Sequence, residues 1–223
     1  MNDFEHMLDS PVLDSYRRLM FEKRLFLFIK RLFDFTVSFV LLAVLFPLIL
    51  ILCAVVAADS RGPVFFCQDR VTKNGRIFRI IKFRTMVSKA PEMGPQVTVN
   101  DDGRVTRAGK FLRKTHLDEL PQLINVLKGD MSFVGTRPEV PRYVDLYSGE
   151  MAATLLMRAG ITSRASIEYS DEARLIGDAD DADRVYVEKI LPLKMHYNLE
   201  YFRKMSVCED ISIMFSTFLQ IFK

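Results

Sequence analysis

The sequence has only three cysteines, which are scattered along the chain at Cys53, Cys67 and Cys208. This spacing fits neither a disulfide framework nor a zinc site, so we expect a reducing compartment. The first 24 residues are polar and mixed in charge, and no small-residue cleavage site follows the apolar run, so we expect no cleavable signal peptide. The aromatic-basic interleaving and helix-turn-helix signatures of nucleic-acid-binding proteins are also lacking, so we expect no nucleic-acid partner.

The chain has no large excess of either charge, because 31 Lys and Arg against 28 Asp and Glu leave a net +3. The distribution of the basic residues is more informative than their number. Many of them lie between residues 61 and 114. A basic surface of this kind suits anionic partners such as lipid headgroups, nucleotides or nucleic acid.

One long apolar run extends from Leu32 to Ala58, with Asp34 as its single charge. A straight membrane span needs about 20 such residues. Pro47 interrupts the run because it lacks an N–H and bends a helix. Lys and Arg flank both ends, so the positive-inside rule cannot orient a simple span. These features leave two alternatives open, a kinked span and a re-entrant hairpin that breaks at Pro47 and returns to the same face.

The rest of the chain predicts an α+β domain that is mostly helical. The run from Val64 to Met86 places the turn signal Lys73-Asn74-Gly75 between two β-type segments, which predicts a hairpin. Helical periodicity extends from Arg107 to Leu127, and helices are also expected at about 142–158 and 184–204. Loops are expected at 87–103 and 171–183. The end of the chain, Ser212 to Phe222, predicts a helix that either lies on a membrane or packs on the domain.

Two adjacent carboxylates, Asp118 and Glu119, open an apolar run among basic residues. In one interpretation, Thr115 caps a helix whose third position is Asp118, and the carboxylate only complements the helix dipole. In the other, the helix N-terminus keeps Asp118 ionised as a nucleophile toward phosphorus, and Glu119 offers oxygen ligands for Mg²⁺.

Several cations near this pair are candidates for neutralising phosphate charge, although each one alone is typical of a solvated surface. They are Lys82, Arg84, Arg113 and Arg137. The segment from Gly129 to Gly135 predicts a flexible turn with free backbone N–H groups, and Pro138 predicts a rigid bend after Arg137.

Together these segments resemble the bacterial sugar transferase family, the monotopic polyprenol-phosphate phosphoglycosyl transferases. The resemblance extends from Lys30 to about Phe222. It is carried by KRLFD (30–34), the proline-broken apolar helix, PVFFCQDRV (63–71), IKFRTM (81–86), RKTHLDELPQLINVLKGDMSFVGTRPE (113–139) and RAGIT (158–162).

The resemblance implies transfer of a sugar 1-phosphate from a UDP-sugar to a polyprenol phosphate such as undecaprenyl phosphate, with release of UMP. Asp118 would be the nucleophile that carries the phosphosugar, and Glu119 a Mg²⁺ ligand beside it. Asp130 and Arg158, which lie in the shared motifs, join the cations above as candidate substrate-binding residues. Further partner hypotheses are membrane lipid, a homodimer and downstream glycosyltransferases of a cell-surface glycan pathway.

The resemblance also implies an organisation in three parts. These are an amphipathic extension (1–29), a re-entrant membrane helix-break-helix (30–60) and a cytosolic domain with membrane-associated C-terminal helices (61–223). The expected location is the cytoplasmic face of the bacterial inner membrane.

Three positions depart from the common family pattern. Phe46 stands where serine often precedes the helix-breaking proline, so Ser38 or a backbone donor would have to serve the freed carbonyl. Thr136 replaces a proline before Arg137. The segment GITSRASIEYSDE (160–172) differs from the usual motif in a region expected near the sugar and phosphates, which leaves the sugar undetermined.

Overall fold

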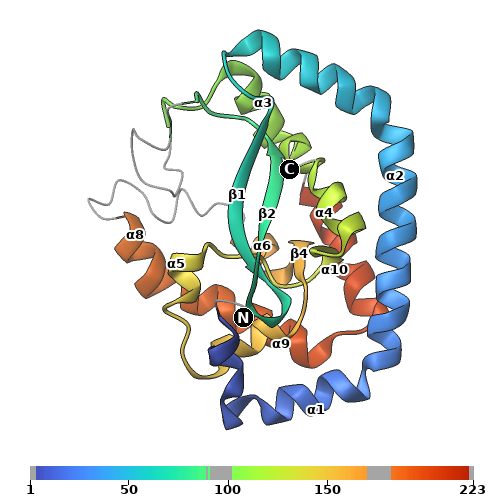
Figure 1. Cartoon of the computed structure of the whole chain (residues 1–223), viewed down its shortest axis with the longest axis vertical. Coiled ribbons are helices and arrows are strands. Elements are labelled where there is room, and N and C mark those ends of the chain that lie inside the picture. Colours follow the sequence, from blue (N-terminus) through green and yellow to red (C-terminus); the bar gives the residue numbers. More distant parts are fainter. Residues whose placement is uncertain (1–3, 89, 91–101, 170–181, 221–223) are drawn as a thin grey trace.

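The computed structural model describes residues 4–88, 90, 102–169 and 182–220 (Figure 1). The chain is mostly helical, as predicted. Its helices are α1 (Asp14–Glu22), α2 (Arg24–Asp59), α3 (Arg107–Lys114), α4 (Gln122–Lys128), α5 (Pro141–Val144), α6 (Arg164–Glu168), α8 (Ala182–Val185), α9 (Leu191–Lys204) and α10 (Val207–Gln220). Its strands are β1 (Phe65–Thr72), β2 (Arg76–Phe83), β3 (Met131–Val134) and β4 (Ala159–Thr162).

The predicted hairpin is confirmed by strands β1 and β2, which pair antiparallel from Phe65 opposite Phe83 to Thr72 opposite Arg76. A short 3-10 turn, Lys73–Gly75, joins them. Asn74 has a φ of 61° and Gly75 a φ of 67°, the left-handed values that asparagine and glycine tolerate best. The local turn chemistry therefore accounts for the position of the hairpin.

A second, parallel pair of strands joins β3 to β4, with Met131 opposite Ala159 and Val134 opposite Thr162. The sequence analysis expected a flexible turn with free N–H groups at 129–135, and that expectation was wrong. The apolar side chains Met131 and Val134 are buried in the core, and the parallel pairing holds the strand.

The helix expected between Arg107 and Leu127 is divided. Helix α3 ends at Lys114, a three-residue 3-10 turn covers Leu117–Glu119, and α4 starts at Gln122. Thr115 does not cap the start of a helix, because its hydroxyl donates to the carbonyl of Phe111 at the end of α3. The acidic pair therefore lies on a tight turn between two helices.

Helix α2 is assigned as one continuous helix with Pro47 inside it. Figure 1 shows that it follows one side of the molecule and then bends over the top. Sharp bends in helices are almost always located at proline or a few other features, and Pro47 is the proline within this helix. Ser38 does not serve the carbonyl that the proline frees, because its hydroxyl donates to Phe35.

Both ends of α2 contact the same domain. Near the first end, Arg31 donates to the last carbonyls of α4 and Asp34 accepts from the N–H of Phe133 in β3. Near the other end, Leu52 and Val56 are buried in a cluster with Phe83 and Leu112. Between these ends α2 exposes large apolar side chains, including Phe39, Val44, Phe46, Leu50 and Ile51.

The N-terminal segment is part of the main core. Leu13 is fully buried, and Tyr16 is buried with its ring edge-on to Phe202 of α9, with centroids 5.2 Å apart. The C-terminal helix α10 buries Ile213 and exposes Val207, Ile211, Phe215, Phe218 and Leu219. It therefore packs on the domain along one face and presents an apolar surface on the other.

The remaining helix predictions were partly correct. The expected helix at 142–158 is a short α5 followed by a 3-10 helix, Gly149–Leu156. The expected helix at 184–204 comprises the end of α8, a π-helical turn (Tyr186–Ile190) and α9. Most of the loops expected at 87–103 and 171–183 lies outside the described residues.

The structure predicts that Arg84 stabilises the end of α2. Its buried guanidinium donates to the carbonyl of Ser60 at 2.6 Å and to the Ser60 hydroxyl at 2.9 Å. Arg84→Met should therefore lower the free energy of unfolding by about 1–3 kcal/mol. The thermal midpoint of the detergent-solubilised chain measures this, and Arg79→Met, on the same strand but 78% exposed, is the matched control. Equal midpoints for the two variants would contradict the prediction.

Candidate active site

The turn that carries the acidic pair is set by its neighbours. His116 adopts the left-handed conformation with a φ of 55° and leads into the 3-10 turn Leu117–Glu119. Gly109 in α3 lies so close to Thr85 that a Cβ at this position would be 2.1 Å from the Thr85 carbonyl oxygen. This close approach fixes α3, and with it the turn, against the end of β2.

Asp118 is 8% exposed, and no hydrogen bond or ion pair reaches its carboxylate from the residues that the structure describes. Burial raises its pKa, and the neighbouring Glu119 adds to this, while Lys82 and Arg113 oppose it. The expected helix dipole does not act here, because α4 starts only at Gln122. Asp118 is therefore a buried carboxylate whose oxygens are not committed to protein donors.

The surroundings of Glu119 have the opposite effect on its pKa. Its Oε1 accepts from Lys82 Nζ at 2.6 Å and lies 3.7 Å from Arg137 NH2. Burial alone would raise the pKa of Glu119, but Lys82 and Arg137 outweigh it and hold the pKa at about 2. The two adjacent carboxylates thus differ, because Glu119 is firmly ionised and Asp118 has an increased affinity for a proton or another cation.

Arg113 lies close enough to Asp118 for the two charges to interact. Its Nε donates to the hydroxyl of Thr85 at 2.8 Å, which orients the side chain. Burial lowers the pKa of Arg113, and the carboxylates of Asp118 and Asp102 counteract this. Lys82, Arg113 and Arg137 therefore lie near the acidic pair, and their role in neutralising phosphate stays a prediction.

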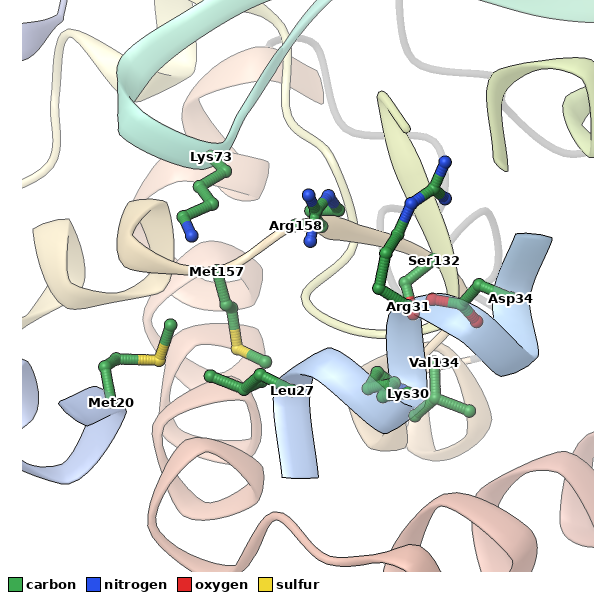
Figure 2. A pocket seen from close by; sticks show the side chains of 10 residues that line it. All are labelled: Met20, Leu27, Lys30, Arg31, Asp34, Lys73, Ser132, Val134, Met157 and Arg158. Carbon is green, nitrogen blue, oxygen red and sulfur yellow. The ribbon is translucent and has the colours of Figure 1, made fainter. Parts of the chain in front are cut away.

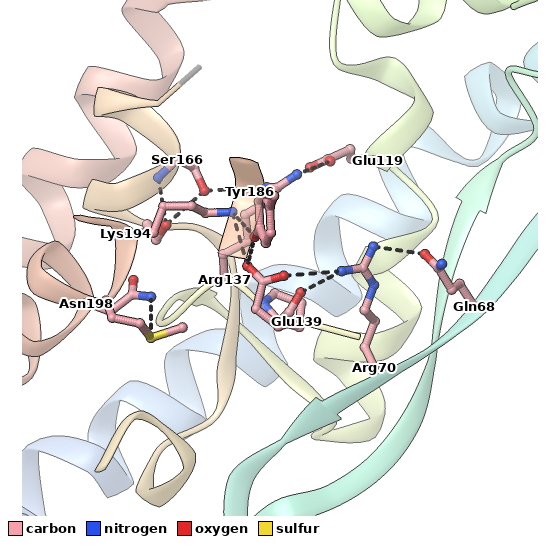
Figure 3. A network of polar contacts seen from close by, with 12 residues as sticks. Gln68, Arg70, Glu119, Arg137, Glu139, Ser166, Tyr186, Lys194 and Asn198 are labelled. Atoms are coloured by element: carbon pink, nitrogen blue, oxygen red, sulfur yellow. Dashed lines mark hydrogen bonds and ion pairs between the residues drawn. The ribbon is translucent and has the colours of Figure 1, made fainter. Parts of the chain in front are cut away.

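A buried polar network fixes the backbone next to Arg137 (Figure 3). Glu139 accepts from Tyr186 at 2.7 Å and from Lys194 at 3.0 Å, and all three residues are buried. Arg70 donates to the carbonyl of Pro138 at 3.0 Å. Arg137 itself reaches Ser166 in α6 at 3.4 Å. The guanidinium that faces Glu119 is thus held by a loop with little freedom.

A groove of about 580 Å³ opens beside this site. Its lining includes His116, Glu119 and Arg137. Most of the other lining side chains are apolar and come from α2, α4, α10 and the segment before α4, among them Phe33, Val37, Leu41, Leu45, Leu120, Leu123, Met214 and Phe218. The groove therefore brings residues of the acidic site together with an apolar surface of the long helix.

Three of the predicted substrate-binding residues do not join this site. Arg84 caps the end of α2, as described above. Asp130 pairs with Arg76 at 2.7 Å, and Arg158 donates to the carbonyl of Gly129 at 3.1 Å. Because Arg76 and Lys82 are six residues apart on β2, these two contacts lie roughly 20 Å from Glu119 along the strand.

The sequence analysis missed His116, Ser166 and Lys194, which line the groove. His116 precedes the acidic pair by two residues, so proximity in the sequence was a usable signal. Ser166 lies in the segment expected near the sugar and phosphates, but its contact with Arg137 depends on tertiary structure. Nothing in the sequence near Lys194 indicates that its charge is buried against Glu139.

The oxygens of Asp118 and Glu119 fit Mg²⁺, a hard cation that is typically bound by one or two carboxylates plus substrate phosphates and water. In the described ranges, no group of three or more His, Cys, Asp or Glu side chains could form a complete metal cage. The uncommitted carboxylate of Asp118 leaves ligand atoms available, whereas Glu119 is already engaged by Lys82. Mg²⁺ at this pair would therefore depend on oxygen ligands from a bound phosphate.

Fold and site together define a membrane-associated class of protein, with one helix long and apolar enough to cross a membrane and an acidic pair surrounded by cations. The family description for bacterial sugar transferases matches residues 25–223. The chain belongs to this family.

Relatives with described activities are similar over most of the chain. An Aeromonas hydrophila UDP-N-acetylgalactosamine-undecaprenyl-phosphate N-acetylgalactosaminephosphotransferase is 38% identical over 174 residues, which are 77% of this chain and 38% of the relative. A Komagataeibacter xylinus undecaprenyl-phosphate glucose phosphotransferase is 38% identical over 81% of this chain and 33% of its own length. A Caulobacter vibrioides UDP-glucose:undecaprenyl-phosphate glucose-1-phosphate transferase is 36% identical over 79% of this chain and 64% of its own length. The aligned part of the chain thus spans about a third of the length of the first two relatives.

The depressed pKa of Glu119 predicts a pH-dependent contribution to stability. A carboxylate whose folded-state pKa falls from 4.5 to about 2 stabilises the fold above pH 4.5, and this contribution disappears as the pH falls toward 2. Its full size is about 3 kcal/mol. The difference in thermal midpoint between the unchanged chain and Glu119→Gln should therefore shrink between these pH values. A difference that does not change with pH would contradict the ion pair.

Proposed function

We propose that the chain is a phosphoglycosyl transferase that moves a sugar 1-phosphate from a UDP-sugar to a polyprenol phosphate. The observation that carries the proposal is the buried, uncommitted Asp118 beside the ionised Glu119, with Lys82, Arg113 and Arg137 around them. The names of relatives, which act on UDP-glucose or UDP-N-acetylgalactosamine and undecaprenyl phosphate, support the same reaction class. The described site does not select one sugar among these.

In the first step, an Asp118 carboxylate oxygen attacks the phosphorus that bears the sugar. The bond from this phosphorus to the bridging oxygen breaks, UMP leaves with the bridging oxygen, and an acyl phosphate joins Asp118 to the sugar phosphate. In the second step, a phosphate oxygen of the polyprenol attacks the same phosphorus. The carboxylate of Asp118 is released and a polyprenol diphosphate sugar is formed.

The surrounding residues stabilise charge that the two steps concentrate on phosphate oxygens. Arg113 interacts with Asp118 and Arg137 with Glu119, and the two guanidinium groups are positioned by Thr85 and Ser166. Lys82 holds Glu119 ionised. Glu119 therefore supports a cation bound to the diphosphate. Bound Mg²⁺ would supply additional neutralisation of the diphosphate.

The apolar groove supports a lipid acceptor. It starts at Glu119 and Arg137 and continues between α2 and α10, where aliphatic and aromatic side chains line it. A polyprenol chain in this groove would bring its phosphate to the charged end. The hydrophobic effect favours such burial by about 25 cal/mol per Å² of apolar surface.

We further propose that α2 is re-entrant and that the domain lies on the cytoplasmic face of the membrane. A helix that crosses the bilayer leaves its ends on opposite sides, whereas both ends of α2 contact one domain. Lys and Arg on both flanks favour the same face by the positive-inside rule. The exposed apolar face of α10 adds a helix that lies along the surface.

The nucleophile is tested with Asp118→Asn, which keeps the size of the side chain but removes the attacking charge. We expect UMP release from a panel of UDP-sugars, with Mg²⁺ and undecaprenyl phosphate, to fall by at least about a thousandfold. A radiolabelled sugar phosphate should stay on the unchanged chain without acceptor and be absent from the variant. Asp130→Asn, which lies away from the site, is the matched control. Retained turnover in Asp118→Asn would refute the assignment.

The re-entrant course is tested with Pro47→Ala. Alanine restores the missing N–H and removes the ring clash, so the bend should straighten and α2 should cross the bilayer. A tag at residue 1 should then become accessible from the opposite side of sealed vesicles. A tag that remains on its original side would show that the bend does not depend on the proline.

A further inference from the structure

A second basic pocket lies away from the acidic pair, where α2 approaches the turn of the hairpin (Figure 2). Its volume is about 30 Å³. Four cationic side chains and a single carboxylate line it, namely Lys30, Arg31, Lys73, Arg158 and Asp34. A pocket of this size has room for about two water molecules, or for two oxygens of a phosphate group whose remainder lies outside it, but not for a sugar nucleotide.

The cations in this pocket outnumber the acids that face them. Lys30 pairs with Asp210, and the Asp34 carboxylate accepts from the N–H of Phe133. Arg31 and Arg158 donate to carbonyls at the end of α4, which carry only partial charge. The ammonium of Lys73 has no hydrogen-bond or ion-pair partner within the described part of the chain.

The grouping of these cations has an energetic cost. Burial lowers the pKa of Lys73, and the nearby Arg158 lowers it further. Burial also lowers the pKa of Arg158, with Arg31 and Arg76 contributing and Asp34 opposing them. Cations that lie together in a half-buried site lower one another's pKa, and a bound anion counteracts this repulsion. The buried hydroxyl of Ser132 lies beside the Asp34 carboxylate in the lining of this pocket.

The position of the pocket indicates which anion would reach it. Lys30 and Arg31 immediately precede the apolar run of α2, so they lie where the helix would enter a membrane. Phe28, Ile29 and Leu32, on the adjacent turns of α2, are exposed and would contact lipid. A phosphate at this level of a bilayer belongs to a phospholipid headgroup.

We propose that Lys73, Arg158 and Arg31 bind the headgroup phosphate of an anionic membrane phospholipid. This lipid is not the acceptor of the transfer reaction, because the hairpin separates Lys73 from Glu119 by roughly 20 Å. The site instead attaches the tip of the hairpin to the membrane beside the first turns of α2. The inference is independent of the proposed chemistry at Asp118.

The test measures lipid retention by the full chain in mild detergent. Phosphatidylglycerol is titrated, and bound lipid is counted by native mass spectrometry, with phosphatidylcholine as the zwitterionic comparison. We expect Lys73→Met to retain phosphatidylglycerol roughly fivefold more weakly, since one Lys near an anionic surface contributes about that factor. Lys73→Arg should retain it normally. Lys128→Met, an exposed lysine at the end of neighbouring α4, is the matched control and should behave as the unchanged chain.

Other outcomes overturn the proposal. Equal retention by Lys73→Met and the unchanged chain, or equal loss in Lys128→Met, would mean that only overall charge matters. Equal retention of phosphatidylcholine would exclude selection of an anionic headgroup. Inorganic phosphate is added as a competitor, and Lys73-dependent binding of phosphate as tight as that of the lipid would identify a free-phosphate site instead. If Lys73→Met does not fold, Lys73→Gln removes the same charge with a polar side chain.

Discussion

Contact between α2 and one domain at both helix ends constrains the rest of the structure. Arg31 and Asp34 attach the first part of α2 to α4 and β3, while Leu52 and Val56 pack against β2 and α3. The acidic turn lies between α3 and α4, and α2 contacts both of these helices. The same arrangement aligns the apolar middle of α2 with the groove that begins at Glu119. The same contacts of α2 therefore determine both how the domain is attached to the apolar helix and how the site is arranged.

Within that frame, two neighbouring carboxylates acquire different properties from their surroundings. Lys82 and Arg137 hold the pKa of Glu119 at about 2, whereas burial raises the pKa of Asp118. Pairs of acids whose environments separate their pKa values are a common way to assign different roles in catalysis. A buried carboxylate without protein donors is stabilised most when a cation and a phosphate bind beside it together. This coupling would limit reaction at Asp118 in the absence of a bound diphosphate.

The sequence predicted elements whose signals are local. The hairpin follows from Asn74 and Gly75, which tolerate the left-handed conformation observed there, and the acidic pair was found from its charge pattern. Signals that depend on tertiary contacts were missed. The helical period continues through His116, so the division between α3 and α4 was not visible. Arg84 resembles a phosphate ligand in the sequence, and only the packing of α2 shows that its guanidinium binds Ser60.

The two hydrogen bonds from Arg31 to α4 also bear on the fate of a chain that has not reached a membrane. Helix α4 directly follows the acidic turn, and its final carbonyls lose these donors when α2 is not packed. Without α2, the groove also loses one wall. A chain in which α2 is not yet packed would therefore hold an incomplete groove beside the acidic turn, so docking of the long helix is a late step that completes the site.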